Sequence, residues 1–332
     1  MYQTIIVPVD GSAPSEAAIP VAARLARGAG ATLELVRVHR TTRADLDQNP
    51  VWGEVFRDLE RKRLASLAER YEPMVGRPIV TELLEPPVVT ALWEHTSSRP
   101  APLIVMTVRG RTGLRRAMLG SVSDGLVRQG VAPVLALRQR RRDGRQPTWK
   151  RADGPFHTVV VPLDGTALAE VALGHAIALA RLTGARLHLV RVVEPAVATP
   201  MVGALAPLAF PMPDEATLTR DDLASEYLEG VAARINADGG QLAITTEIVL
   251  SDRPATTIVD SGRRNAADLM VMATHGRGGS RLLLGSVADS VLRKGPDAIL
   301  FVHPTEVSLP AGLAERESSS IERRSYALAN DS

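Results

Sequence analysis

Residues 4–38 read TIIVPVDGSAPSEAAIPVAARLARGAGATLELVRV, and residues 158–192 read TVVVPLDGTALAEVALGHAIALARLTGARLHLVRV. The two segments align without a gap, and about half of their positions are identical. A second pair follows downstream. Residues 103–137 read LIVMTVRGRTGLRRAMLGSVSDGLVRQGVAPVLAL, and residues 269–302 read LMVMATHGRGGSRLLLGSVADSVLRKGPDAILFV. We infer that the chain is a tandem duplication, and we call its two halves the first copy and the second copy.

Four apolar runs have the pattern of buried parallel strands. IIVPV and LIVMT, with VVVPL and LMVMA in the second copy, are continuous rather than alternating, which is typical of strands covered by helices on both faces. Further strands are expected at LELVRV, PIVTELL and PVLALR, and at LHLVRV, LAITTEIVL and DAILFV. With helices between the strands, each copy has the order βαβαβαβαβ. This order predicts an α/β fold of two tandem doubly wound domains.

The segments between these strands have helical spacing. EAAIPVAARLA places apolar residues three and four apart, and Ser12 or Thr166 can cap the helix that follows the first strand. Pro14 suits a first turn, whereas Pro20 falls inside the expected helix and is expected to kink it. Longer helices are expected over roughly 51–72 and 214–236, and shorter ones over VVTALWEHT, ATTIVDSGRR, SVSDGLVRQ and SVADSVLRK.

Length and composition agree with two globular domains. The chain has 332 residues, of which 45% are apolar and 23% charged, and a domain typically has ~150 residues. There is no cysteine, which excludes disulfides, thiolate metal sites and cysteine nucleophiles and suits a cytoplasmic protein. No apolar run reaches the ~18 residues that a membrane span needs, and no secretory signal pattern precedes the first strand. We therefore expect a cytoplasmic protein without a membrane partner.

A basic segment separates the copies. Residues 138–154, RQRRRDGRQPTWKRADG, contain seven Arg or Lys and two Asp. We interpret this run as a solvated linker. Nucleic-acid binding is disfavoured because Trp149 stands alone, without interleaved aromatics. The Pro-rich apolar stretch at 195–213 is expected to be a mobile flap. The expected boundaries are domains at 1–138 and 157–304, a linker at 139–156 and a disordered tail at 305–332.

One aspartate follows the first strand of each copy. Asp10 and Asp164 are expected at the carboxyl edge of the sheet, where ligands bind in open α/β folds. A carboxylate there can accept a hydrogen bond from a ribose hydroxyl or an adenine amine. The alternative is that each aspartate turns the chain with its following glycine or caps the next helix. The repetition excludes chance but leaves both roles open.

A glycine-rich loop follows the fourth strand of each copy. Gly110 and Gly113, or Gly276 and Gly279, precede a basic stretch, and Gly120-Ser121 or Gly285-Ser286 then begins a helix. Glycines let the backbone approach a phosphate, and a helix N-terminus offers free N–H groups to an anion. The alternative is that Ser121 and Ser286 only cap their helices. Neither a Gly-Lys-Ser/Thr loop nor a G-x-G-x-x-G motif after the first strand occurs.

These motifs resemble the universal stress protein family in its tandem two-domain form. The resemblance rests on IIVPVDGS, VVVPLDGT, RGRTGLRRAMLGSV and THGRGGSRLLLGSV, and it covers nearly the whole chain except the linker, flap and tail. It implies a five-stranded parallel sheet of order 3-2-1-4-5 in each copy, with helices on both faces. It also implies that two such domains pair, here the two copies with each other, and it leaves a homodimer open.

Members of this family divide into those that bind ATP and those that do not. The binding pattern is Gly, two residues, Gly, nine residues, then Gly-Ser or Gly-Thr. The first copy departs from it at Thr107, which stands in the first Gly place and could crowd a sugar or phosphate. The second copy has Ala273 in that place and a loop one residue shorter. The site residues that the resemblance implies are Pro8, Asp10, Val38, Thr107, Gly110, Gly120, Ser121 and Val122, with Pro162, Asp164, Val192, Ala273, Gly276, Gly285, Ser286 and Val287 in the second copy.

We therefore expect a regulatory protein of the stress response that binds ATP, with or without Mg²⁺, and has at most slow hydrolysis. Two alternatives stay open: a slow ATPase that uses the same pocket, and an interaction scaffold that binds no nucleotide. Phosphoryl transfer needs a metal-holding acid and a group that positions the nucleophile. Asp124 and Asp289, one turn into the last helix of each copy, are expected to face solvent or to complement the helix N-terminus. The seven histidines have no metal-ligand spacing.

Overall fold

The computed structural model describes residues 2–39, 50–108, 120–139, 147–151, 154, 156–195, 215–237, 242–274 and 286–304. Nearly all of the expected flap and the whole of the expected tail lie outside these residues. So do Gly110, Gly276 and Gly285 of the expected site.

Each copy forms a five-stranded parallel sheet in the predicted order. The strands of the first copy are β1 (Thr4–Pro8), β2 (Thr32–Val38), β3 (Val80–Leu84), β4 (Pro102–Val108) and β5 (Val134–Arg138). Those of the second copy are β6 (Thr158–Pro162), β7 (Arg186–Val193), β8 (Ile244–Leu250), β9 (Leu269–Ala273) and β10 (Ala298–Val302). The spatial orders are β3-β2-β1-β4-β5 and, from the far edge inward, β8-β7-β6-β9-β10. The doubly wound architecture is thereby confirmed, with the strand order reversing between β1 and β4 and between β6 and β9.

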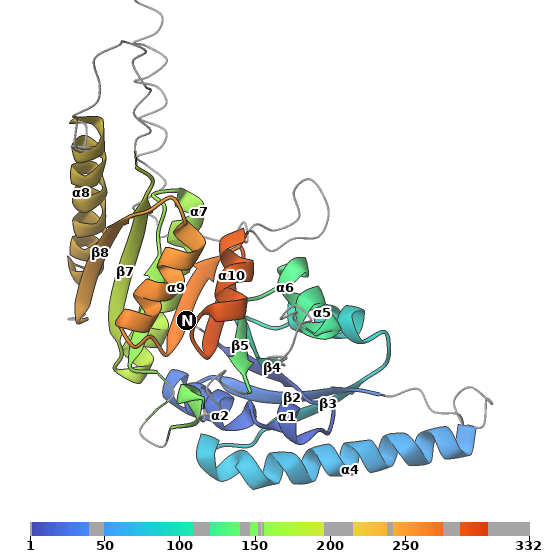
Figure 1. Ribbon diagram of the computed structural model, residues 1–332. Helices are drawn as coiled ribbons and strands as arrows, with labels where there is room; N and C mark the ends of the chain where they lie inside the picture. Colours follow the sequence, from blue (N-terminus) through green and yellow to red (C-terminus); the bar gives the residue numbers. More distant parts are fainter. Residues whose placement is uncertain are drawn as a thin grey trace, which may run out of the picture.

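The two copies join edge to edge in one ten-stranded sheet (Figure 1). β5 and β10 pair antiparallel, with Leu135 opposite Leu300 and Ala136 opposite Ile299. The remaining pairs of the sheet are parallel. The expected pairing of the copies is therefore intramolecular, and it is made by backbone hydrogen bonds as well as by side chains.

Helices cover both faces of this sheet. In the first copy they are α1 (Ala13–Glu16), α2 (Ile19–Ala29), α4 (Pro50–Val75), α5 (Val88–Ser97) and α6 (Ser121–Gln129). In the second they are α7 (Ala167–Thr183), α8 (Glu215–Ala237), α9 (Pro254–Arg264) and α10 (Ser286–Lys294). α2, α4, α7 and α8 lie on one face and α5, α6, α9 and α10 on the other. Neighbouring strand residues point to opposite faces, so Ile5 packs into one core and Ile6 into the other.

The first helix of each copy begins where its cap residue predicts. The Ser12 hydroxyl accepts the N–H of Ser15 at 3.3 Å, and the Thr166 hydroxyl accepts that of Ala169 at 3.2 Å. The expected kink at Pro20 is wrong, because the chain forms two helices there instead of one. α1 ends at Glu16, and Pro20 lies in the first turn of α2. A proline ring and its missing N–H are tolerated in a first turn but not in a helix interior.

The basic segment between the copies is not solvated throughout. Its described part contains a 3₁₀ turn, η1 (Thr148–Lys150), in which Trp149 is only 2% exposed. The Trp149 Nε1–H donates to the carbonyl of Arg138 at 2.8 Å, and the N–H of Thr148 donates to Asp297 Oδ2 at 2.9 Å. The interpretation of this part as a solvated linker is therefore wrong. Thr148 and Trp149 are buried, and the free energy of burying the large indole outweighs the tendency of the basic neighbours to keep the segment in solvent.

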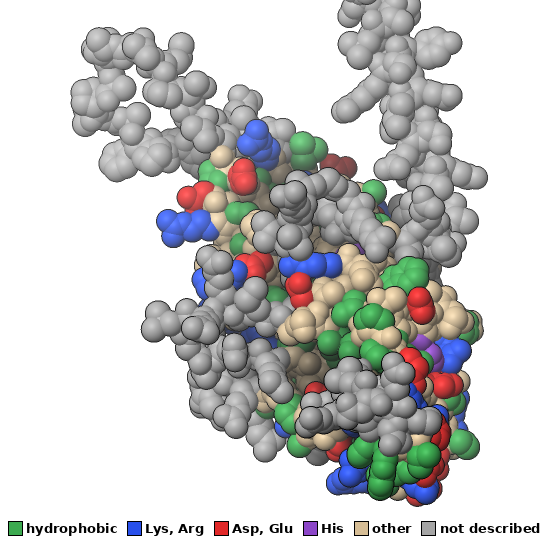
Figure 2. Space-filling view, turned by 90° about the vertical axis from the view of Figure 1, so that its right-hand side faces the viewer, with side chains coloured by type: hydrophobic (Ala, Val, Ile, Leu, Met, Phe, Trp, Pro, Cys, Tyr) green, Lys and Arg blue, Asp and Glu red, His purple; other side chains and the backbone are tan. Residues whose placement is uncertain are grey.

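The outer end of α4 carries an exposed apolar surface. Figure 2 shows apolar side chains gathered at the lower end of the molecule, where α4 extends beyond the sheet in Figure 1. The exposed apolar residues of this part of α4 are Val51, Trp52, Val55, Phe56 and Leu59. Within the described ranges, no helix combines the length and the hydropathy that crossing a membrane requires.

Candidate functional site

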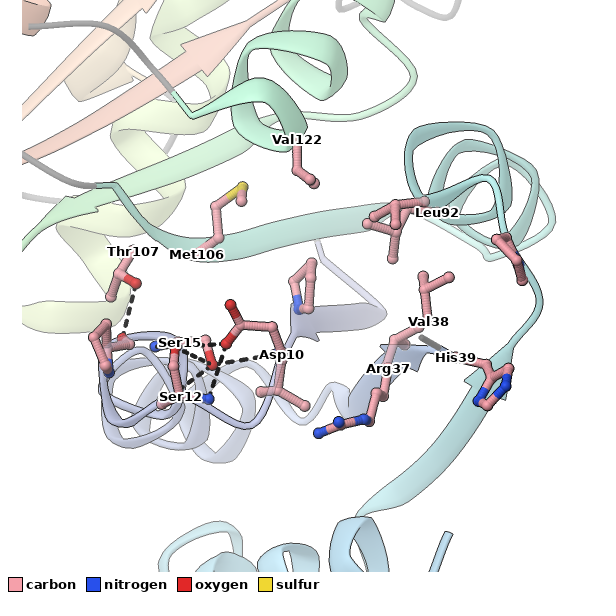
Figure 3. Close-up of a pocket in the computed structure, with 16 residues that line it drawn as sticks. Asp10, Ser12, Ser15, Arg37, Val38, His39, Leu92, Met106, Thr107 and Val122 are labelled. Atoms are coloured by element: carbon pink, nitrogen blue, oxygen red, sulfur yellow. Dashed lines mark hydrogen bonds between the residues drawn. The ribbon is translucent and has the colours of Figure 1, made fainter. Parts of the chain in front are cut away.

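A cavity of about 650 Å³ opens at the carboxyl ends of β1, β2 and β4, where the strand order reverses. Its size suits a drug-sized or nucleotide-sized ligand. The lining is mainly apolar, and Asp10, Ser12 and Ser15 form a polar group on one side of it (Figure 3). The apolar lining comes from Pro8, Val36, Val38, Leu92, Met106 and Val122, and the polar lining from Asp10, Ser12, Ser15, Arg37, His39 and Thr107.

Asp10 is fixed by the turn that leads into α1. Its Oδ1 accepts the N–H of Ser12 at 2.9 Å and the Ser12 hydroxyl at 2.5 Å, while its own N–H donates to the Ser15 hydroxyl at 3.2 Å. In Figure 3 the other carboxylate oxygen points into the space below Met106. Partial burial raises the pKa of Asp10, but the hydrogen bonds from Ser12 and Ser15 lower it by more. The pKa therefore lies below its ordinary value, and the carboxylate is an ionised acceptor at neutral pH.

The second copy repeats this turn. Asp164 Oδ1 accepts the N–H of Thr166 at 2.9 Å and its hydroxyl at 2.6 Å. Both aspartates therefore have the structural role that the sequence left open. In the first copy that role engages one oxygen and leaves the other directed at the cavity.

Thr107 lies at the end of β4, in the wall of the cavity. Its hydroxyl donates to the carbonyl of Pro14 in α1 at 2.8 Å and accepts a long hydrogen bond of 3.4 Å from Gln139 Nε2. This bridge holds the side chain in a fixed position between β4 and α1. Thr107 therefore occupies space at the cavity edge that a glycine would leave open.

The start of α6 adds Val122 to the cavity. Gly120 is the cap residue of α6 and no side chain caps this end, so Ser121 is the first helical residue and not its cap. Ser121 is exposed, and the Ser123 hydroxyl donates back to the Gly120 carbonyl at 3.0 Å. Asp124 pairs with Arg128 at 2.6 Å, and Asp289 of α10 pairs with Arg293. Among the described residues, no side chain caps the first N–H groups of α6, and such groups attract anions.

The corresponding residues of the second copy lie at the equivalent strand and helix ends. Pro162 ends β6, Ala273 ends β9 and Ser286 begins α10. Val192 and Val287 are partly buried against the same apolar core as Val38 and Val122. The structure therefore places these residues of the second copy at the same strand and helix ends as their counterparts in the first.

Sequence reasoning missed two arginines beside these turns. Arg37 passes so close to Gly11 that a β-carbon there would lie 2.5 Å from its Nη1, and it pairs with Glu60 at 2.9 Å. Arg191 takes the equivalent place beside Gly165, with its guanidinium 4.9 Å from the centre of the Tyr227 ring. The signal was present, because LVRV occurs identically in both copies.

His39 gives the first copy a feature that the second lacks. Its Nδ1 lies 2.6 Å from Glu60 Oε2, and its side chain is buried at the cavity edge. The residue at the equivalent place is Val193. Among the described residues, no group of three or more acids and histidines is placed to hold a metal ion.

Comparison with known proteins gives one family. The model of the universal stress protein family matches residues 1–138 and 155–303. Universal stress protein Rv2005c of Mycobacterium tuberculosis is 30% identical over 297 residues, covering 87% of this chain and 92% of that protein. Universal stress protein Rv1996 of the same organism is 26% identical, covering 92% and 97%. A crystal structure of a universal stress protein from Archaeoglobus fulgidus is similar in fold, with a TM-score of 0.64, 21% identity, and coverage of 90% of this chain and 98% of that one.

Proposed function

The chain belongs to the universal stress protein family, and from this premise we propose that it is a nucleotide-binding regulatory protein of the stress response, with ATP as its ligand. One observation carries the proposal: the ionised carboxylate of Asp10 lies in a cavity with largely apolar walls at the strand-order switch. Such a cavity can enclose a base between Val38, Met106 and Val122, while Asp10 accepts a hydrogen bond from a base amine or ribose hydroxyl.

The N-terminus of α6 is the part of the site that we propose holds the phosphates of the nucleotide. Gly120 and Ser121 directly precede Val122, which lines the cavity, and within the described part of the chain no side chain caps this end of the helix. A helix N-terminus attracts anions through its free N–H groups and its dipole. Glycines in the preceding loop are expected to complete this end of the site.

Two competing functions use the same cavity. An interaction scaffold without nucleotide is favoured by Thr107, which is held in the wall by Pro14 and reduces the room beside the sugar or phosphate. A slow ATPase would need a group that positions water. His39 lines the cavity, but its ring is engaged by Glu60.

Titration of the full-length protein tests the proposal. Bound nucleotide is extracted and identified, and ATP is then titrated by calorimetry against the wild type, Asp10→Ala, Asp164→Ala and the double variant. We expect each single variant to lose one site and the double variant to lose binding. Asp58→Ala is the matched control, because Asp58 is an acid of α4 that pairs with Lys62 at 2.7 Å and does not line the cavity. If the wild type binds no ATP, the proposal fails and the interaction scaffold is favoured. If it hydrolyses ATP over several turnovers, the slow ATPase is favoured.

The organisation of the chain completes the proposal. We place the domain boundaries at 1–138 and 157–304, which the two matched segments support. We also expect the protein to act in the cytoplasm. A homodimer of the tandem chain is testable by sedimentation.

A further inference from the structure

The last strand of each copy reaches the last helix of the other. Arg138 ends β5, and its guanidinium lies at the C-terminus of α10 in the second copy. Nη1 donates to the carbonyl of Gly295 at 3.0 Å, and Nη2 donates to the carbonyls of Val291, at 2.9 Å, and Leu292. All three carbonyls lie at the C-terminal end of α10. The Val291 carbonyl also accepts the N–H of Gly295, at 2.7 Å, so Arg138 adds to the backbone hydrogen bond that closes this end of the helix.

The reciprocal contact is made by His303, which follows β10. Its imidazole packs on Gly130, the residue that ends α6, so closely that a β-carbon there would lie 2.8 Å from its Cγ. Burial lowers the pKa of His303, although a hydrogen bond to the backbone of Val127 opposes this shift. The contact at α6 is therefore made by a neutral ring, whereas that at α10 is made by a permanent cation.

The two helices that receive these different contacts, α6 and α10, each begin at one of the proposed nucleotide sites. α6 begins at Ser121 and α10 at Ser286, the residues assigned to the phosphate end of each site. A cation at a helix C-terminus stabilises the helix through its dipole as well as through hydrogen bonds. α10 also receives Arg263 at the Lys294 carbonyl from within its own copy, at 3.2 Å, but that side chain is more than half exposed.

Arg138 is by contrast only 9% exposed. Its own N–H donates to the Asp297 carbonyl at 2.8 Å, and its carbonyl accepts the Trp149 indole. Both the backbone and the side chain of Arg138 are thus held by groups around the junction of the copies. A residue fixed in this way can set the position of α10 relative to the sheet.

We propose that Arg138 is a positioning residue for the nucleotide site of the second copy, acting through α10 from the first copy. This inference rests on the proposed function. It means that a nucleotide site in the second copy is complete only when the two copies are joined, and that the second site depends on the junction more than the first.

The test uses the full-length chain with Arg138→Met and Arg138→Lys. Hydrogen exchange of α10 measures whether Arg138 holds the helix, and it needs no nucleotide. We expect Arg138→Met to speed exchange at the α10 amides by about tenfold or more, as expected for loss of hydrogen bonds from a charged donor. Arg138→Lys, which keeps the charge, should restore part of the protection. Arg128→Met, which removes a surface ion pair of α6, is the control and should leave α10 unchanged.

ATP titration then separates positioning from general stability. The second site is measured in the Asp10→Ala background and the first in the Asp164→Ala background. We expect Arg138→Met to weaken ATP binding about three- to tenfold at the second site and to leave the first unchanged. Unchanged α10 exchange, unchanged affinity, or equal weakening at both sites would overturn the inference. A wild type without ATP binding would overturn the proposed function instead, and the exchange result would still decide whether Arg138 holds α10.

Discussion

A β-carbon added to Gly11 would lie 2.5 Å from Nη1 of Arg37. Gly11 has a φ of +78°, in the left-handed region that side chains rarely adopt. Its lack of a side chain therefore serves two purposes: it permits the turn after Asp10, and it leaves a path for Arg37 to reach Glu60, 2.9 Å away. The second copy repeats the arrangement with Gly165 and Arg191, at the looser distance of 3.1 Å.

Gly11→Ala should destabilise the protein more than Gly76→Ala. Gly76 has the same φ of +78° and no atom within 4 Å of an added β-carbon. Its substitution therefore measures only the cost of placing a side chain in the left-handed conformation, about 1 kcal/mol. Gly11→Ala should cost about 1 kcal/mol more, because Nη1 of Arg37 must shift beside the mostly buried ion pair that its Nε and Nη2 make with Glu60. Gly165→Ala should fall between them. Urea unfolding measures all three, and equal losses for Gly11→Ala and Gly76→Ala would contradict the role of Arg37.

Thr107 provides a test of crowding in the cavity. Thr107→Gly removes the side chain that Pro14 holds in the wall and should tighten ATP binding by about threefold or more. Thr107→Val keeps the volume and loses only the hydroxyl. It should leave affinity unchanged while costing about 1 kcal/mol of stability. Calorimetry and urea unfolding of both variants check this, and tighter binding by the valine variant would show that volume is not the cause.

The repeated apolar runs predicted the strands well, because a strand buried on both faces needs an unbroken run of apolar residues. The pairing of the two copies was expected from the family resemblance, but its edge-to-edge geometry through β5 and β10 was not predicted. Both strands are buried along their whole length. An edge strand would have had exposed positions, as β3 and β8 do. In the sequence, VLALR and AILFV lack the interspersed Thr and Glu of VTELL and ITTEIVL, and this difference indicates strands in the interior of a larger sheet.

The candidate site was predicted in part. Pro8, Asp10, Val38, Thr107 and Val122 were named from the sequence and line one cavity. Arg37 was missed because a charged residue at the end of an alternating strand is ordinarily taken for a solvent-facing one. Trp149 was missed for a similar reason: its neighbours are basic, and burial of a single indole leaves no periodic pattern.

Acidification should destabilise the contact between Tyr2 and His175. The Tyr2 hydroxyl lies 2.8 Å from His175 Nδ1, across the two copies. Burial lowers the pKa of His175 to about 4 and raises that of Tyr2, so a protonated phenol meets a neutral imidazole. The unfolded chain takes up a proton below pH 6.5 and the folded protein only near pH 4, so stability falls as pH drops through this window, by about 3 kcal/mol at most.

The variant His175→Gln isolates the loss of stability that protonation of His175 causes. The difference in unfolding free energy between wild type and variant should shrink as pH falls from 7 to 4, because only the wild type loses stability by protonating residue 175. Glu247, whose pKa is lowered from 4.5 to about 2, also begins to lower stability near pH 4.5, but it does so in wild type and variant alike and therefore cancels in the difference. A difference that stays constant with pH would show that His175 is not buried as a neutral ring.

Trp149→Phe should loosen the junction between the copies. The indole is 2% exposed and donates to the carbonyl of Arg138, so phenylalanine loses both volume and a hydrogen bond. We expect a loss of about 2 kcal/mol in unfolding free energy, combining one unmade buried hydrogen bond with a small cavity. Trp93→Phe is the control and should cost less than about 0.5 kcal/mol, because Trp93 is 37% exposed. The emission of Trp149 is the difference between the fluorescence of the wild type and that of Trp149→Phe. We expect acrylamide not to quench this difference, and quenching would contradict the burial of Trp149.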